Sequence, residues 1–162
     1  MAHGQNFLLI YPWRLLKTYS TPMPVPSFLS EASTILFVDD EAQTCKWFAD
    51  TFAQEFTIRT AENVEAALTQ LNAYSDEIAV LMTDYRMPGR TGLDLLKIMK
   101  RDFKSVLCIL TTGYAATEVA IEAVNEGQVF KILQKPLDYQ QTKLALREAL
   151  AVHNARAREK AL

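Results

Sequence analysis

The chain has 162 residues, 49% of them hydrophobic, and its 17 basic and 19 acidic side chains leave a formal net charge of −2. This length and composition predict one domain with a well-filled core. The small net charge argues against nucleic-acid binding by this chain alone and against attraction to an anionic membrane. The two cysteines, Cys45 and Cys108, lie in apolar segments without paired spacing or a preceding secretory signal, which favours a reducing, cytoplasmic location.

Residues 1–33 differ from the remainder and are predicted to form a poorly ordered N-terminal extension. Within them, residues 7–17 are apolar but are interrupted by a proline and an arginine, so no stable membrane insertion is expected. Residues 21–33 contain several prolines, as linkers do. An alternative for the apolar stretch is an interfacial or partner-docking segment, because Trp, Tyr and Arg beside leucine favour such surfaces.

From residue 34 onward, short apolar runs alternate with longer amphipathic stretches. The runs have the length of strands and comprise residues 35–38, 56–58, 78–82, 106–110 and 129–133. Between them, apolar residues recur three and four positions apart, as on a helix face: Cys45, Phe48, Ala49 and Phe52; Ala66, Ala67 and Leu71; Leu93, Leu96 and Met99; Val119, Ala120 and Val124. Asp138 is expected to cap a fifth helix, with Gln141 at its third position.

This alternation predicts an α/β fold in which five mostly parallel strands are covered by helices on both faces. Residues 34–153 are the expected domain, and residues 154–162 are a helical tail or the start of a linker. In a parallel sheet the carboxyl ends of the strands lie at one edge, and ligands bind there.

Side chains capable of chemistry follow four of the predicted strands. They are Asp39 and Asp40 after the first run, Asp84 after the third, Thr111 and Thr112 after the fourth, and Lys135 after the fifth. Three carboxylates held close together need a cation to remain ionised at neutral pH, and Mg²⁺ prefers open oxygen sites of this kind. Zinc is not expected, because neither cysteine nor histidine joins the cluster.

The same residues suit phosphoryl transfer to a carboxylate. Asp84 stands alone at its strand end and is the expected nucleophile. Asp39 and Asp40 are adjacent and better suited to hold the metal, Asp40 directly and Asp39 directly or through water. Lys135 would pair with the phosphoryl group, and Thr112 would donate a hydrogen bond to it.

The motifs FVDDE, TDYRMPGRTG, LTTGYA and KP, in this order and at strand ends, resemble the receiver domain of two-component response regulators over roughly residues 34–153. The resemblance implies a flavodoxin-like, doubly wound (βα)5 sheet that accepts a phosphoryl group from a histidine kinase or phosphotransfer protein of a phosphorelay. It implies a signalling protein, not an enzyme, that assists its own phosphorylation and dephosphorylation and then switches a partner-binding surface around the fourth helix, fourth strand and fifth strand.

Position by position, the resemblance assigns each site residue a role. It implies that Asp84 is the phospho-acceptor, Thr112 the switch hydroxyl, Lys135 the phosphate-binding residue, and that Asp39, Asp40, Asp84 and the backbone carbonyl of Arg86 are ligands of Mg²⁺. It further implies a cis peptide bond between Lys135 and Pro136.

The sequence departs from the family pattern at the switch. The family often places an aromatic residue three positions before the lysine, where this chain has Ile132. Phe130 lies two positions earlier on the same strand face and is expected in the core. Arg86 and Tyr114 occupy positions where the resemblance implies control over hydrolysis of the acyl phosphate; both could restrict water or lie on a solvated surface.

Two other functions fit less well. A phosphatase of the haloacid dehalogenase type also uses an Asp nucleophile with Mg²⁺, but it expects an Asp two residues later. Here Glu41 follows Asp39 at that spacing and Arg86 follows Asp84. A non-phosphorylated, receiver-like interaction module would have no physical need for all five site residues.

The last helix is predicted to extend past the core. Residues 138–162 contain no glycine or proline and would span about 37 Å at 1.5 Å per residue. The excess predicts a homodimer or a connection to an output domain outside this chain; a frayed, charged tail is the alternative. His3 and His153 are both expected to be solvent-exposed and are not expected to be ligands.

Overall fold

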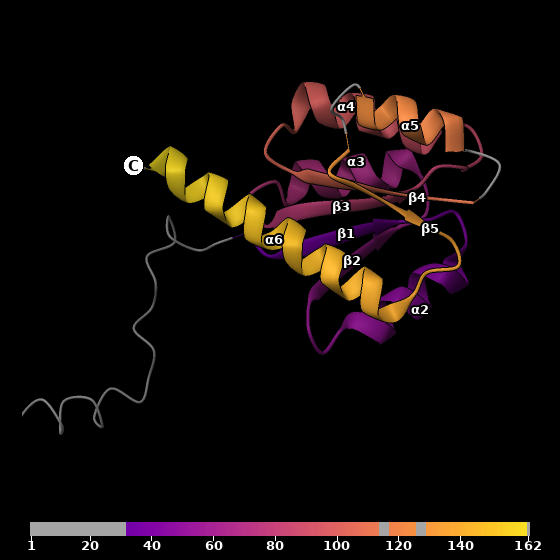
Figure 1. Cartoon of the computed structure of the whole chain (residues 1–162), viewed down its shortest axis with the longest axis horizontal. Helices are drawn as coiled ribbons and strands as arrows, with labels where there is room; N and C mark the ends of the chain where they lie inside the picture. Colours follow the sequence, from indigo (N-terminus) through magenta and orange to yellow (C-terminus); the bar gives the residue numbers. More distant parts are fainter. Residues whose placement is uncertain (1–31, 114–116, 126–128, 162) are drawn as a thin grey trace, which may run out of the picture. The chain divides into compact units, whose positions relative to one another are not determined.

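The computed structural model describes residues 32–113, 117–125 and 129–161 (Figure 1). Nearly all of the predicted N-terminal extension, with His3, and also Tyr114 lie outside the described residues. Strands and helices alternate along the described part of the chain as β1 (Thr34–Val38), α2 (Ala42–Phe52), β2 (Thr57–Ala61), α3 (Val64–Ala73), β3 (Ile78–Asp84), α4 (Gly92–Asp102), β4 (Leu107–Thr112), α5 (Thr117–Asn125), β5 (Lys131–Gln134) and α6 (Tyr139–Ala161).

The strands form one sheet in the order β2-β1-β3-β4-β5, and every neighbouring pair is parallel. This is the doubly wound order expected when helices cross over on both faces. The fold class predicted from the sequence is therefore confirmed. None of the described helices is both long enough and apolar enough to cross a membrane.

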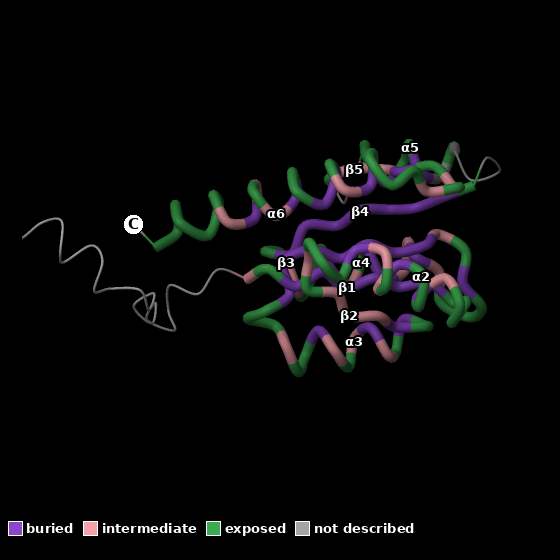
Figure 2. Tube along the Cα trace, turned by 90° about the horizontal axis from the view of Figure 1, so that it is seen from below, coloured by how far each residue is buried: buried purple, intermediate pink, exposed green. Residues whose placement is uncertain are grey.

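The core has two halves, one on each face of the sheet. Along β1, Leu36 and Val38 belong to the half covered by α3, α4 and α5, whereas Ile35 and Phe37 belong to the half covered by α2 and α6. This division follows from the alternation of side chains along a strand. β1, β3 and β4 are buried along their whole length, and Figure 2 shows this burial for the central strands. Both faces of these strands must therefore be largely apolar.

Several strand limits and two predicted core residues differ from expectation. β2, β4 and β5 begin one or two residues later than predicted. The edge strands β2 and β5 also end later than predicted, because these half-buried strands carry polar side chains that an apolar run does not reveal. On α5, Ala120 and Ala123 face the core, while Val124 is 46% exposed. Phe130 is 36% exposed and precedes β5, so the prediction that it lies in the core is wrong.

Helix α6 is fixed to the sheet along its first half. The Asp138 carboxylate accepts a hydrogen bond of 2.8 Å from the backbone N–H of Gln141, which confirms the predicted cap. The buried face then repeats at Thr142, Ala145, Leu146, Ala149 and His153. His153 is only 8% exposed, so the prediction that it faces solvent is wrong. The helical spacing carries the core-facing stripe through this position.

Glu55, in the turn after α2, provides a second attachment for α6. Its carboxylate accepts a hydrogen bond from the Tyr139 hydroxyl at 2.8 Å and lies 2.9 Å from Lys143 Nζ and 3.1 Å from Arg147 Nη2. Hydrogen bonds from Lys143 and Tyr139 hold the pKa of Glu55 below its usual value. The start of α6 is therefore held, and its last turns extend beyond the amino ends of the strands (Figure 1).

The N-terminus of α4 forms a capping box beside the predicted site. Thr91 Oγ1 accepts a hydrogen bond of 3.2 Å from Asp94 N, and Asp94 Oδ2 accepts one of 2.9 Å from Thr91 N. Thr91→Ala is expected to lower the free energy of unfolding by about 1 kcal/mol in urea titrations, because the partly buried N–H of Asp94 loses its acceptor. Thr69→Ala, which removes an exposed hydroxyl bonded to the preceding turn, is the control. Equal stability of the two variants would contradict this role for the box.

Candidate functional site

Three carboxylates meet at the carboxyl edge of the sheet. β1 lies beside β3, with Val38 opposite Thr83, so the residues that follow β1 are adjacent to Asp84 at the end of β3. Single carboxylate oxygens of Asp39, Asp40 and Asp84 lie within 4.8 Å of one another. Asp39 and Asp84 are buried and Asp40 is exposed. The three carboxylates that the sequence places at this edge therefore lie together.

Lys135 joins the two buried acids. Its Nζ atom lies 3.1 Å from Asp39 Oδ2 and 3.0 Å from Asp84 Oδ2. The backbone N–H of Lys135 donates to the carbonyl of Thr112 at 2.9 Å, which continues the pairing of β4 with β5 up to the lysine. The peptide bond from Lys135 to Pro136 is cis, as the resemblance implied.

The electrostatics of this cluster follow from burial and crowding. Burial raises the pKa of Asp84 above its usual value, Lys135 opposes that change, and the charge of Asp39 adds to it. For Lys135, burial acts to lower the pKa, but hydrogen bonds and charges from Asp84 and Asp39 together raise it. Lys135 is therefore held as a cation, and both acids form an ion pair with the same ammonium group.

Backbone donors orient the two buried carboxylates. The N–H of Glu41 donates to Asp39 Oδ1 at 3.0 Å, and the backbone N–H of Arg86 donates to Asp84. One carboxylate oxygen of Asp39 thus accepts a hydrogen bond from the backbone and the other accepts one from Lys135. Asp40 is exposed. The predicted role of the Arg86 carbonyl as a metal ligand stays a prediction.

The two threonines that end β4 differ in what they contact. Thr111 Oγ1 donates to the carbonyl of Thr83 within the sheet at 3.4 Å, and Thr112 Oγ1 donates to the carbonyl of Gly113 at 3.0 Å. Thr112 also lines a cavity of about 280 Å³ between β4, β5 and α5, as does Ile132. Because Thr111 is engaged between strands, Thr112 is the hydroxyl better placed to change partner, and its switch role stays a prediction.

Gly92 supports the site in a way that sequence reasoning missed. It is the first residue of α4, and its N–H donates to the carbonyl of Tyr85 at 2.9 Å. A Cβ atom at this position would lie 2.1 Å from the backbone oxygen of Asp84. The helix can therefore approach the end of β3 this closely only with glycine. The second glycine in TDYRMPGRTG was the available signal, but the motif does not reveal its contact with the end of β3.

Comparisons with known proteins identify the family. The family described as "Response regulator receiver domain" matches residues 35–147. The DNA-binding transcriptional regulator NtrC of Proteus hauseri is 32% identical over 120 residues, which are 73% of this chain and 24% of that protein. The regulatory protein AtoC of Escherichia coli strain K12 is 32% identical over 128 residues, which are 78% of this chain and 27% of that protein. The match thus spans about a quarter of each regulator.

A solved structure agrees with the sequence comparisons. The crystal structure of a response regulator receiver domain protein from Clostridium thermocellum superposes with a TM-score of 0.70 at 28% identity, over 74% of this chain and 94% of that one. The family match runs from the first strand into the last helix and so includes the strand ends that carry the acidic cluster. The chain belongs to the receiver domain family of two-component response regulators.

Proposed function

We propose that Asp84 accepts a phosphoryl group from a histidine kinase or phosphotransfer protein and that the modified domain switches a partner-binding surface. The observation that carries this proposal is the position of Lys135 Nζ, 3.0 Å from Asp84 and 3.1 Å from Asp39, beside three clustered carboxylates. A carboxylate nucleophile with an adjacent ammonium group can attack phosphorus while the charge on the phosphoryl oxygens is neutralised. Binding of partners then follows from a shift between two conformations.

In the proposed reaction, an oxygen of Asp84 forms a bond to phosphorus as the bond from phosphorus to the donor imidazole nitrogen breaks. The imidazole keeps the electron pair of that bond. Lys135 is in contact with Asp84 before transfer and would move to an oxygen of the bound phosphoryl group. Thr112 would turn its hydroxyl from the Gly113 carbonyl to another phosphoryl oxygen. The same groups would position water for hydrolysis of the acyl phosphate, so the domain would assist its own dephosphorylation.

The donor set fits Mg²⁺. Three carboxylates and one ammonium group leave two negative charges at the cluster, which matches a divalent cation. Asp39, Asp40, Asp84 and the Arg86 carbonyl would hold the ion, since oxygen ligands with remaining water are typical of Mg²⁺. When bound, the ion neutralises charge on the acids and on the phosphoryl oxygens.

Incubation with acetyl phosphate and Mg²⁺ tests the proposal. The intact mass of the protein is expected to increase by one phosphoryl group, and excess EDTA is expected to prevent the increase, because the uncompensated acids repel the phosphate. Restoring Mg²⁺ above the EDTA concentration should restore labelling. The proposal is wrong if no phosphoryl group is gained with Mg²⁺, which would favour a non-phosphorylated interaction module.

We also propose where the domain ends, what it associates with and where in the cell it is located. α6 remains packed on the core as far as His153, and its residues are exposed from Ala155 onward. This supports a domain of residues 34–153 followed by a helical tail or linker. A homodimer, an output domain outside this chain and a cytoplasmic location remain our predictions.

A further inference from the structure

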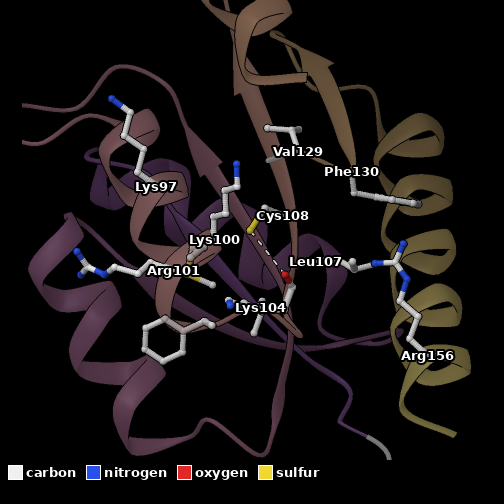
Figure 3. A pocket seen from close by; sticks show the side chains of 12 residues that line it. Lys97, Lys100, Arg101, Lys104, Leu107, Cys108, Val129, Phe130 and Arg156 are labelled. Atoms are coloured by element: carbon white, nitrogen blue, oxygen red, sulfur yellow. Dashed lines mark hydrogen bonds between the residues drawn. The ribbon is translucent and has the colours of Figure 1, made fainter. Parts of the chain in front are cut away.

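A second cavity lies at the opposite edge of the sheet from Asp84. It has a volume of about 820 Å³ and lies between the C-terminal half of α4, the amino ends of β4 and β5, and α6 (Figure 3). The residues just before and at the start of β4, Val106 and Leu107, form part of its wall, and Arg156 from α6 reaches it from the other side. We refer to this cavity as the basal groove.

The basal groove is rich in positive charge. Lys97, Lys100, Arg101 and Lys104 are spaced three and four residues apart along α4 and the turn after it, and all four line the groove with Arg156. Arg101 is paired with Asp102 at 2.9 Å and points away from Arg156 in Figure 3. Lys104 and Arg156 form no ion pair with any residue that the structure describes. A chain with a net charge of −2 therefore concentrates cations here.

The groove also has an apolar, partly aromatic side. Val129 and Phe130 precede β5, and Phe130 lines the groove with its ring beside α6 (Figure 3). The backbone N–H of Phe130 donates to the carbonyl of Cys108 at 2.8 Å, so the position of its backbone is fixed by the sheet. The side chain is nevertheless 36% exposed. An exposed ring on a backbone held in this way offers a flat surface on which a planar group can stack.

We propose that the basal groove binds a phosphorylated ligand that carries an aromatic ring, of the nucleotide class. Lysines from α4 and the turn after it, together with Arg156 from α6, would hold the phosphates, and Arg156 can donate two hydrogen bonds to one phosphate. Phe130 would stack on the ring, as aromatic side chains do on bases. The volume falls in the range of small-molecule sites. Because Lys104 and Arg156 lie on different elements, the bound ligand would also fix the last turns of α6 relative to α4.

Titration with a fluorescent ADP derivative labelled on the ribose, followed by fluorescence anisotropy, tests this proposal. EDTA is present throughout, so that no metal ion connects the nucleotide to the acidic cluster. Lys104→Glu and Arg156→Glu are each expected to weaken binding by about tenfold or more, because each reversal places a repelling charge beside a phosphate. Lys46→Glu on α2, which makes the same change of charge at an exposed position outside the groove, is expected to have little effect.

Stacking of the ligand on the Phe130 ring is tested separately, by competition with unlabelled ligands. Unlabelled ADP should displace the probe at lower concentrations than pyrophosphate does. Phe130→Ala should weaken the binding of ADP and leave the binding of pyrophosphate unchanged. No binding up to about 1 mM, or equal weakening by Lys46→Glu, would overturn the proposal, since either result leaves only non-specific attraction. Displacement by a polyglutamate peptide at lower concentrations than by ADP would also overturn it, in favour of an acidic protein partner.

Discussion

Asp84→Asn is expected to abolish phosphoryl incorporation from acetyl phosphate and Mg²⁺. In the reaction that we propose for the wild type, an oxygen of the Asp84 carboxylate would form a bond to phosphorus as acetate leaves. Asparagine has nearly the same shape, but its amide oxygen carries no full negative charge and is a poor nucleophile. The intact mass after incubation measures the loss. Neutral hydroxylamine should remove the group from wild-type protein, because it cleaves an acyl phosphate but not a phosphate ester.

Asp50→Asn is the matched control for this prediction. Asp50 is an exposed acid on α2 that pairs with Lys46 at 2.6 Å, so the substitution makes the same chemical change away from the cluster. Labelling of this variant should equal that of the wild type. Labelling of Asp84→Asn at the wild-type level would show that another side chain is the acceptor, and the assignment of Asp84 would be withdrawn.

A loss of labelling is informative only if Asp84→Asn remains folded, and the electrostatics predict that it does. Burial raises the pKa of Asp84, which means that the folded state disfavours the ionised form present at neutral pH. Removing this charge relieves repulsion from Asp39, while Lys135 keeps its contact with Asp39 at 3.1 Å. The melting temperature of the variant in EDTA should therefore be no lower than that of the wild type.

The sequence allowed prediction of features that depend on periodicity and strand direction. Because parallel strands end at one edge, the placement of Asp39, Asp84 and Lys135 in one cluster could be expected, and the structure shows this cluster. Their chemical roles are still predictions. The burial of His153 follows from helical spacing, which continues the stripe of Ala145, Leu146 and Ala149, but hydrophobicity alone does not predict it for a polar side chain. The exposure of Phe130 could not be predicted from its hydrophobicity, because it depends on where β5 begins.

The contacts of individual side chains also could not be predicted from the sequence. That Thr111 donates to the carbonyl of Thr83 while Thr112 donates to that of Gly113 depends on side-chain rotamers at the end of β4. The basal groove likewise requires that α6 bring Arg156 near α4, two elements that cover opposite faces of the sheet. Spacing within one helix predicts a charged face but not the element across from it.

Gly92→Ala is expected to lower the free energy of unfolding by about 3 kcal/mol, at the upper end of the range for an overpacked site. Its Cβ would lie 2.1 Å from the Asp84 backbone oxygen and 3.0 Å from both the Asp84 carbonyl carbon and Tyr85 Cα. All three are backbone atoms, so no flexible side chain can move away. The start of α4 or the end of β3 must shift, and the hydrogen bond from Gly92 to Tyr85 would be lost.

The sign of this effect separates the steric explanation from helix propensity. Alanine in a helix is favoured over glycine by about 1 kcal/mol, so propensity alone predicts a more stable variant. Gly113→Ala, where an added Cβ meets no atom of the described residues within 4 Å, is the control and should change stability by less than about 0.5 kcal/mol. Urea unfolding measures both variants. Since the displaced backbone carries Asp84, Gly92→Ala should also slow labelling by acetyl phosphate by at least about tenfold. A Gly92→Ala protein as stable as the wild type would contradict the close approach of α4 to β3.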